Sequence, residues 1–422
     1  MGKGLLNKLK LGFAGLSLIG ASYFNSVKAQ EEDSLKCNNT IVHKMLQVED
    51  GLKLDIKKST NGQKWTEENF KAFPSLQTLD SLIDESKCYI KQKDNYTKKD
   101  IEKISENIYS NILKKFPNIK EREKIDLCYR TSLIYLAIGQ TNNLPFYGVV
   151  VRGVMETPSH MFVRYDSDGM HDPVNPGNLI NKEDINIETT TGKVYNDSIP
   201  DDSLVKKFII FREDLKGTDY LKNLDEDELL SLAYLYRSKK YFDSWVIEND
   251  TRKGFIDLDK AIQLNPNFFE AYNLKAAIYM HKTYAAGGGP VDKEAAKKAI
   301  YNYKTSLVIY PYLESLNNKA RLLYKEFEEY GEVIKECTKG INILKKIGKE
   351  RYPDLPDDLK EIYLSQSSSF YFKRALAYEK IGEREKYEKD YDDFQFYEYQ
   401  GTDFGAILFM DRVNRNKNKK IE

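Results

Sequence analysis

The chain has 422 residues, of which 41% are hydrophobic and 12% aromatic. It is therefore long enough for two or three domains with sizeable cores, and its composition excludes a disordered protein. Basic and acidic residues balance at 65 each, so neither nucleic acid nor an anionic membrane surface is expected as a partner. Four histidines and four cysteines show no metal-ligand spacing, so we expect no metal and no other cofactor.

Residues 1–29 are typical of an export signal. Three lysines precede an apolar stretch from Leu11 to Phe24, and Val27-Lys28-Ala29 fits a small-residue cleavage site. We therefore expect an exported protein, periplasmic, secreted or on the cell surface, with cleavage after Ala29. Retention of this segment as a membrane anchor is the alternative, but the stretch is interrupted by glycine and serine and is shorter than the ~20 apolar residues of a spanning helix.

Residues 30–95 form a polar segment with little periodicity, apart from a short helix predicted over residues 75–86. From Lys98 to Phe116 the pattern changes. Isoleucines at positions 101, 104, 108 and 112 predict an amphipathic helix, which Pro117 ends.

A cysteine follows at a second predicted helix start. Asp126 is expected to be the N-cap, and leucines and alanines then recur at helical spacing as far as Gly139. Cys128 would lie in the first turn, where the helix dipole and unpaired backbone N–H groups favour the thiolate. A lone cysteine on such a helix is ordinarily a buried apolar residue. If Cys128 is catalytic, its own backbone N–H is the expected oxyanion donor.

His160 opens a strand-like run after Pro158. A neutral imidazole there can take the thiol proton and return it to a leaving amine, if a third group sets its tautomer. Two acids could serve. Glu188 lies in a β-prone run and follows by 28 residues (188 − 160), while Asp172 lies near a turn and follows by 12 (172 − 160).

Around these residues, from Asp126 to Leu224, the chain resembles the transglutaminase-like superfamily of papain-related cysteine hydrolases. Residues 144–151 resemble the family's first strand after the cysteine helix, and residues 159–164 resemble its histidine strand. The resemblance implies an α+β papain-like core domain at residues 96–223.

Carried over, the family's triad would be Cys128 as nucleophile, His160 as base and Glu188 as orienting acid. Asp172, in an Asp-Pro motif, is the alternative acid of other branches. Glu188 is favoured because Tyr220–Leu224 and the helices beyond resemble the branch with Glu-Thr-Thr. Residues 169–185 would then be an inserted loop, in which His171 is expected to be an ordinary loop histidine and not a substrate contact.

Export affects how the cysteines are interpreted. The four could form two disulfides with three connectivities. If Cys128 stays free for catalysis, Cys37 and Cys88 are the expected pair. Cys337 shares an apolar helix face with Val333 and Gly340 and is expected to be a buried thiol.

From residue 224 to 410 the chain is expected to form helix pairs, followed by a basic tail at residues 411–422. Three segments share one register, and each is expected to begin a helix with an alanine that admits a close neighbour: residues 271–276, 315–320 and 370–375. Helix ends at Asn265-Pro266 and Tyr310-Pro311 resemble junctions between tetratricopeptide repeats. The alanine spacings of 44 (320 − 276) and 55 (375 − 320) exceed the repeat's usual ~34 residues, so insertions are expected.

Two functions are therefore expected as alternatives. The first is an exported transglutaminase-like cysteine hydrolase, acting on an amide bond of a protein or peptide substrate, with an all-α tetratricopeptide-like domain whose groove binds a protein partner or the substrate. The second is an inert exported scaffold in which only the helical repeats bind a partner, since fold alone does not determine function. A membrane is a partner only if the N-terminal segment is retained.

Overall fold

The computed structural model describes residues 40–48, 76–91, 93, 95–117, 124–151, 160–167, 184–196, 218, 220–243, 251–284, 291–350 and 352–398. Helices make up 74% of these residues, and the strands form one small antiparallel sheet. The predicted α+β papain-like core is therefore wrong, because the architecture is mostly helical. That core was implied by the resemblance of short segments, whereas each strand has only four to six residues.

Two predicted helices precede the sheet. The short helix is α4 (Leu76–Ser86) and the amphipathic one is α5 (Lys98–Lys115), which confirms both predictions. Thr97 and Asp100 form a capping box at the start of α5. All four isoleucines of its apolar stripe are buried.

The central helix α6 (Lys124–Thr141) is buried on all sides along its middle, from Thr131 to Gly139. A helix that is enclosed on every side must be apolar around its circumference, and α6 accordingly lacks a polar face there. It packs against the first two strands of the sheet and against α4. This helix carries the candidate nucleophile.

The sheet has the order β1-β2-β3-β4, and all neighbours are antiparallel. Its strands are β1 (Phe146–Val151), β2 (His160–Tyr165), β3 (Ile185–Glu188) and β4 (Lys193–Asn196). His160 begins β2, as predicted, opposite Val151, while Glu188 ends β3 opposite Lys193. Helix α6 contacts β1 and β2, and α5 contacts β3 and β4.

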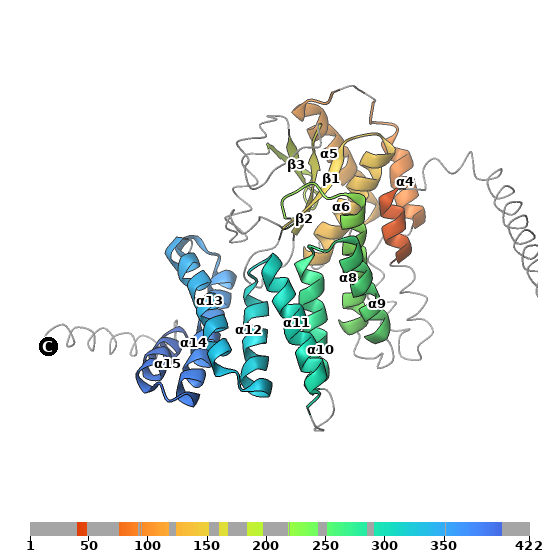
Figure 1. The fold of residues 1–422 in the computed structure, drawn as a ribbon. Helices are drawn as coiled ribbons and strands as arrows, with labels where there is room; N and C mark the ends of the chain where they lie inside the picture. The colour runs from red at the N-terminus through yellow and green to blue at the C-terminus, as the bar shows by residue number, and fades with distance from the viewer. Residues whose placement is uncertain are drawn as a thin grey trace, which may run out of the picture.

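The second half of the chain is a row of helices that leads away from the sheet (Figure 1). These are α8 (Glu226–Asp243), α9 (Thr251–Leu264), α10 (Phe269–Tyr284), α11 (Lys293–Ile309), α12 (Leu313–Leu322), the π-helical turn η3 (Leu323–Phe327), α13 (Tyr330–Glu350), the short 3-10 turn η4 (Tyr352–Asp354), α14 (Asp357–Lys380) and α15 (Arg384–Glu398). Each packs mainly on its neighbours in sequence, and α12 also contacts α10 and α14. The arrangement is compatible with the predicted repeats.

The predicted repeat register holds in two segments and fails in the third. Residues 271–276 and 315–320 begin two residues after the starts of α10 and α12, whereas residues 370–375 lie late in α14. Residues 370–375 therefore do not begin a helix, because α14 starts at Asp357. The alanine at the end of each segment is fully buried, as expected for close helix contacts.

One hydrophobic core joins the sheet to the first helices of the row. The buried residues of this core range from Ile41 to Tyr312 in the sequence. They therefore lie on both sides of residue 224, where the helical-repeat domain was predicted to begin. The Tyr220 ring contacts Phe269 and Tyr310 at centroid distances of 5.6 and 5.4 Å. Tyr129, next to the candidate nucleophile, contacts Tyr236 of α8 at 4.2 Å. The sheet and α8–α11 therefore stabilise one another.

We expect Gly340→Ala to lower the free energy of unfolding by about 1–3 kcal/mol. A Cβ at Gly340 would lie 2.5 Å from the ring of Phe370, which is fully buried and has no space to retreat. Gly331→Ala, on the same helix, is the matched control because a Cβ there meets nothing within 4 Å. Urea titration measures both. An equal loss in the two variants would show that the Phe370 contact is not the cause.

Candidate catalytic site

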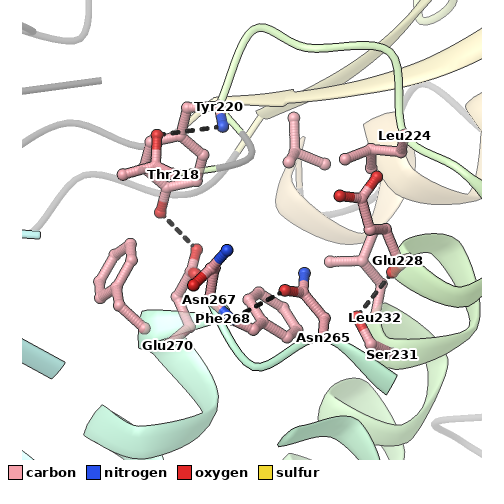
Figure 2. Close-up of a pocket in the computed structure, with 12 residues that line it drawn as sticks. Thr218, Tyr220, Leu224, Glu228, Ser231, Leu232, Asn265, Asn267, Phe268 and Glu270 are labelled. Carbon is pink, nitrogen blue, oxygen red and sulfur yellow. Dashed lines mark hydrogen bonds between the residues drawn. The ribbon is translucent and has the colours of Figure 1, made fainter. Parts of the chain in front are cut away.

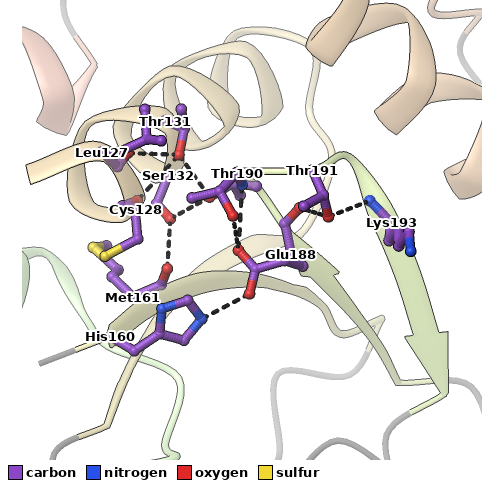
Figure 3. A network of polar contacts seen from close by, with 11 residues as sticks. Leu127, Cys128, Thr131, Ser132, His160, Met161, Glu188, Thr190, Thr191 and Lys193 are labelled. Carbon is purple, nitrogen blue, oxygen red and sulfur yellow. Dashed lines mark hydrogen bonds and ion pairs between the residues drawn. The ribbon is translucent and has the colours of Figure 1, made fainter. Parts of the chain in front are cut away.

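Cys128, His160 and Glu188 meet where α6, β2 and β3 come together. His160 Nε2 lies 2.8 Å from Glu188 Oε2. Cys128 lies on the other side of the imidazole ring (Figure 3) and hydrogen bonds with it. Because Nε2 is used by Glu188, the nitrogen that serves the thiol is Nδ1. The structure thus brings the three predicted residues into the order thiol, imidazole, carboxylate.

The electrostatics of the trio favour a charged imidazole. Burial by itself lowers the pKa of His160, but hydrogen bonds with Cys128 and Glu188, together with their charges, raise it to about 9. Burial likewise raises the pKa of Glu188, yet the His160 hydrogen bond and charge hold it below its usual value. Glu188 therefore stays ionised, and the proton resides on His160 at neutral pH.

The turn that follows β3 fixes the Glu188 carboxylate. Thr190 donates to Oε1 from its hydroxyl at 2.7 Å and from its backbone N–H at 3.3 Å. The other oxygen, Oε2, is left to face His160. With each oxygen assigned to a separate donor, the carboxylate cannot rotate without losing a hydrogen bond.

Three buried hydroxyl groups join the same elements behind the trio. The Thr189 hydroxyl lies 2.9 Å from those of Thr131 and Ser132 on α6 (Figure 3). Ser132 also donates to the carbonyl of Met161, next to His160, at 3.2 Å. This hydroxyl cluster of Thr131, Ser132 and Thr189 connects the nucleophile helix, the histidine strand and the acid's turn. No pattern in the sequence predicted this cluster, although Thr189 adjoins Glu188 in the chain.

We expect Thr189→Val to slow alkylation of Cys128 about tenfold, because α6 and β3 lose their shared hydrogen bonds and small displacements of reacting groups are costly. Thr189 is a positioning residue, so Thr189→Ser, which keeps the hydroxyl, should restore the rate. The measurement is the rate of iodoacetamide labelling at pH 7, with the thermal midpoint as a check on folding. Equal rates in the Val and Ser variants would contradict the expectation.

Cys128 does not lie in the first turn of its helix, where the sequence pattern predicted it. Helix α6 begins at Lys124, so Asp126 is not its N-cap and Cys128 falls in the second turn. In an α-helix that starts there, the N–H of Cys128 points to the carbonyl of Lys124. The predicted use of this N–H as oxyanion donor is therefore wrong. The error arose because the apolar repeat begins later than the helix itself.

A fully buried arginine lies farther along the histidine strand. Arg164 donates to Asn186 Oδ1 and to the carbonyl of Leu221, both at 2.9 Å. Asn223, in the same segment, accepts from Arg164 at 3.3 Å and donates to Asp166. These contacts hold residues 220–224 against the sheet. They give the Tyr220–Leu224 segment a structural role that sequence spacing alone did not indicate.

A pocket lies between the sheet and the helical row (Figure 2). In it the hydroxyl of Tyr220 donates to Glu270 Oε1 at 2.6 Å, and Asn265 caps the loop that leads into α10. None of its lining residues belongs to the trio or the hydroxyl cluster. The pocket is thus part of the junction between the two halves of the chain.

The structure describes two of the remaining cysteines. Cys337 is fully buried, which confirms that prediction, and burial raises its pKa to about 12. Cys88 is a free, exposed thiol, while its predicted partner Cys37 lies outside the described residues. Among the residues that the structure describes, no group of His, Cys, Asp and Glu is arranged to hold a metal ion.

Several sequence predictions fall outside the described residues. These are the export signal with its cleavage site at Ala29, the alternative acid Asp172 with its neighbour His171, and the basic tail. No helix in the described part of the chain has the length and apolarity needed to cross a membrane.

Comparison with known proteins adds no family. Neither a scan against protein-family models nor a search of the curated proteins finds a match to this chain. The transglutaminase-like resemblance therefore depends on the residues themselves.

Proposed function

We propose that this protein is a cysteine hydrolase that cleaves an amide bond of a protein or peptide through a thioester on Cys128. The observation that supports it best is the single imidazole that contacts the Cys128 thiol on one side and Glu188 on the other. A thiol, an imidazole and an orienting carboxylate are the groups that nucleophilic amide cleavage requires.

The proposed reaction uses each member of the trio once per half-reaction. Before the attack the Cys128 thiol has already passed its proton to His160 Nδ1, and the sulfur then attacks the amide carbon. The carbon–nitrogen bond then breaks as the imidazolium returns the proton to the leaving amine, and an acyl thioester remains on Cys128. Water, deprotonated by His160, hydrolyses the thioester to a carboxylic acid and restores the thiol. Glu188 holds the imidazole in place and stabilises its positive charge.

Acyl transfer to an amine is the same chemistry with a different acceptor. An amine that reaches the thioester before water would form a new amide bond, as in transglutaminases. The helical row α8–α15 is proposed to hold the protein substrate or a protein partner. We also propose that the chain acts outside the cytoplasm, where mass spectrometry of the secreted protein should find a new N-terminus at Gln30.

The first experiment is the rate of iodoacetamide alkylation of the mature protein, with each cysteine resolved by mass spectrometry. The exposed thiol of Cys88 is an internal reference in the same tube. We expect Cys128 to react faster than Cys88 at pH 6–7 although it is buried, because His160 removes its proton. Slower labelling of Cys128 than of Cys88 throughout would instead support the inert scaffold.

The second experiment separates hydrolysis from transfer. The protein is incubated with a peptide library and a fluorescent primary amine, with Cys128→Ala as the matched control. New carboxyl termini or deamidated side chains indicate hydrolysis, and incorporation of the amine indicates transfer. Identical product spectra from the parent and the variant would exclude Cys128 chemistry on these substrates.

A further inference from the structure

We propose that the α12–α14 region binds an acidic peptide segment through a cluster of three cations, Arg321, Lys325 and Lys373. Arg321 lies in the last turn of α12, Lys325 lies in the π-helical turn η3, and Lys373 lies on α14. This inference specifies the partner of the helical row, and it does not depend on the chemistry at Cys128. We call these three residues the cation cluster.

The cation cluster, in which Arg321 and Lys373 are half-buried and Lys325 is exposed, differs in its pairing from the enclosed cations of the helical row. Arg237 pairs with Asp257, Lys319 with Glu336 and Arg374 with Asp390, each through a carboxylate that is almost fully buried. Such pairing is the rule for charges removed from water. In the described part of the chain, by contrast, no carboxylate forms an ion pair with Arg321, Lys325 or Lys373. Three neighbouring positive charges are thus left without a counter-ion.

Arg321 has unused donors in an enclosed position. Its Nε is buried and, among the described residues, has no hydrogen-bond partner. Its Nη2 reaches only the thioether sulfur of Met280 at 3.3 Å, which is a weak acceptor, and its guanidinium lies 5.9 Å from the ring centre of Tyr284. A buried donor without an acceptor costs free energy, which an anionic ligand would recover.

The pKa of Lys373 depends on burial and on the charges of the other two cations. Burial lowers its pKa to about 8, and the charges of Arg321 and Lys325 act in the same direction, with the neighbouring Cys337 opposing them. Its ammonium group donates to the hydroxyl of Ser369 at 2.5 Å. The helix positions place the three side chains together: Arg321 follows Asn317 by one turn of α12, and Lys325 lies in the next turn, η3. Lys373 follows Ser369 by one turn of α14, and Ser369 donates to Asn317 across the two helices.

The nearby acids are engaged elsewhere. Glu326 hydrogen bonds with the hydroxyl of Tyr284, and Glu314 lies 3.5 Å from the side-chain amide of Asn273. Among the described residues, neither acid forms an ion pair with a member of the cation cluster. An external carboxylate is the group that would complete the cation cluster.

A row of polar side chains next to the cation cluster favours a peptide over a free anion. Ser369 donates to Asn317 Oδ1 at 3.1 Å, and Asn317 donates to Gln366 Oε1 at 3.4 Å. The row joins α12 to α14 and leads directly to Lys373. Side-chain amides can pair with the N–H and C=O groups of an extended backbone, while the cations bind its acidic side chains. The π-helical turn is a further sign, since such turns are frequent at functional sites.

The test uses the full mature protein and a fluorescein-labelled peptide of ten glutamates, with binding followed by fluorescence anisotropy. We expect Arg321→Met and Lys373→Met each to weaken binding about tenfold, since each removes a charge-assisted contact. Lys304→Met, which removes an exposed cation of α11, is the matched control and should change the affinity less than twofold. A peptide of ten glutamines should not bind.

Protection of Lys373 from acetic anhydride at pH 8, resolved by mass spectrometry, gives a readout at the residue itself. The glutamate peptide should slow acetylation of Lys373 at least fivefold, and inorganic phosphate at the same charge concentration should not. Equal affinity of the parent, Lys373→Met and Lys304→Met would overturn the site. Equal protection by phosphate would show that the cation cluster binds a small anion and would overturn the proposal of an acidic peptide. Neither outcome bears on alkylation of Cys128, so the two proposals can fail separately.

Discussion

In His160→Ala, alkylation of Cys128 by iodoacetamide at pH 7 should be about 100-fold slower than in the parent protein, the lower range for loss of a positioned base. The variant removes the imidazole that contacts the thiol, and Cys128 is buried, so no solvent base can easily replace it. Labelling of each cysteine is followed by mass spectrometry over time.

The other thiols serve as controls for this variant. Cys88 is exposed and outside the site, so its rate should stay the same. Cys337 is fully buried with a raised pKa and should remain unlabelled in both proteins. Labelling of Cys337 in the variant would show unfolding, and an unchanged rate at Cys128 would mean that His160 does not act as its base.

Glu188→Gln should reduce amide cleavage about 10³-fold and shift its pH dependence, because the carboxylate both orients the imidazole and stabilises its charge. In the parent protein the pKa of His160 is raised to about 9, so the imidazolium that protonates the leaving amine is lost only as the pH rises through about 9. The Glu188 charge counteracts the effect of burial on His160. Without that charge, burial lowers the pKa of His160. The decline in activity should then begin at lower pH.

Histidine NMR measures the same shift without any substrate. The chain has four histidines, so the His160 signal can be assigned by its loss in His160→Ala. Since the folded pKa exceeds the ordinary value of 6.5, the stability that this interaction contributes is complete below pH 6.5 and disappears as the pH rises through about 9. Glu188→Gln should remove much of this dependence. An unchanged titration of His160 would show that Glu188 is not its electrostatic partner.

Local sequence patterns were sufficient for single elements. The isoleucine repeat and Pro117 identified α5, and the β-prone run after Pro158 placed His160 at the start of β2. Such patterns work because capping, helical periodicity and turn residues act within a few positions of the chain. The same locality explains two errors. The apolar repeat missed the first residues of α6, and the shared alanine register mistook the interior of α14 for a helix start.

The sequence by itself determined that the chain contains a thiol, an imidazole and a carboxylate in this order on elements of the expected kinds. The tertiary structure decided the rest. It set the mostly helical architecture, the contact of Glu188 with His160, the hydroxyl cluster around Thr189 and the cation cluster around Lys373. These features join residues far apart in the chain. They depend on packing and on shared burial, which change the hydrogen bonding and charge of a side chain without leaving a periodic signal in its neighbours.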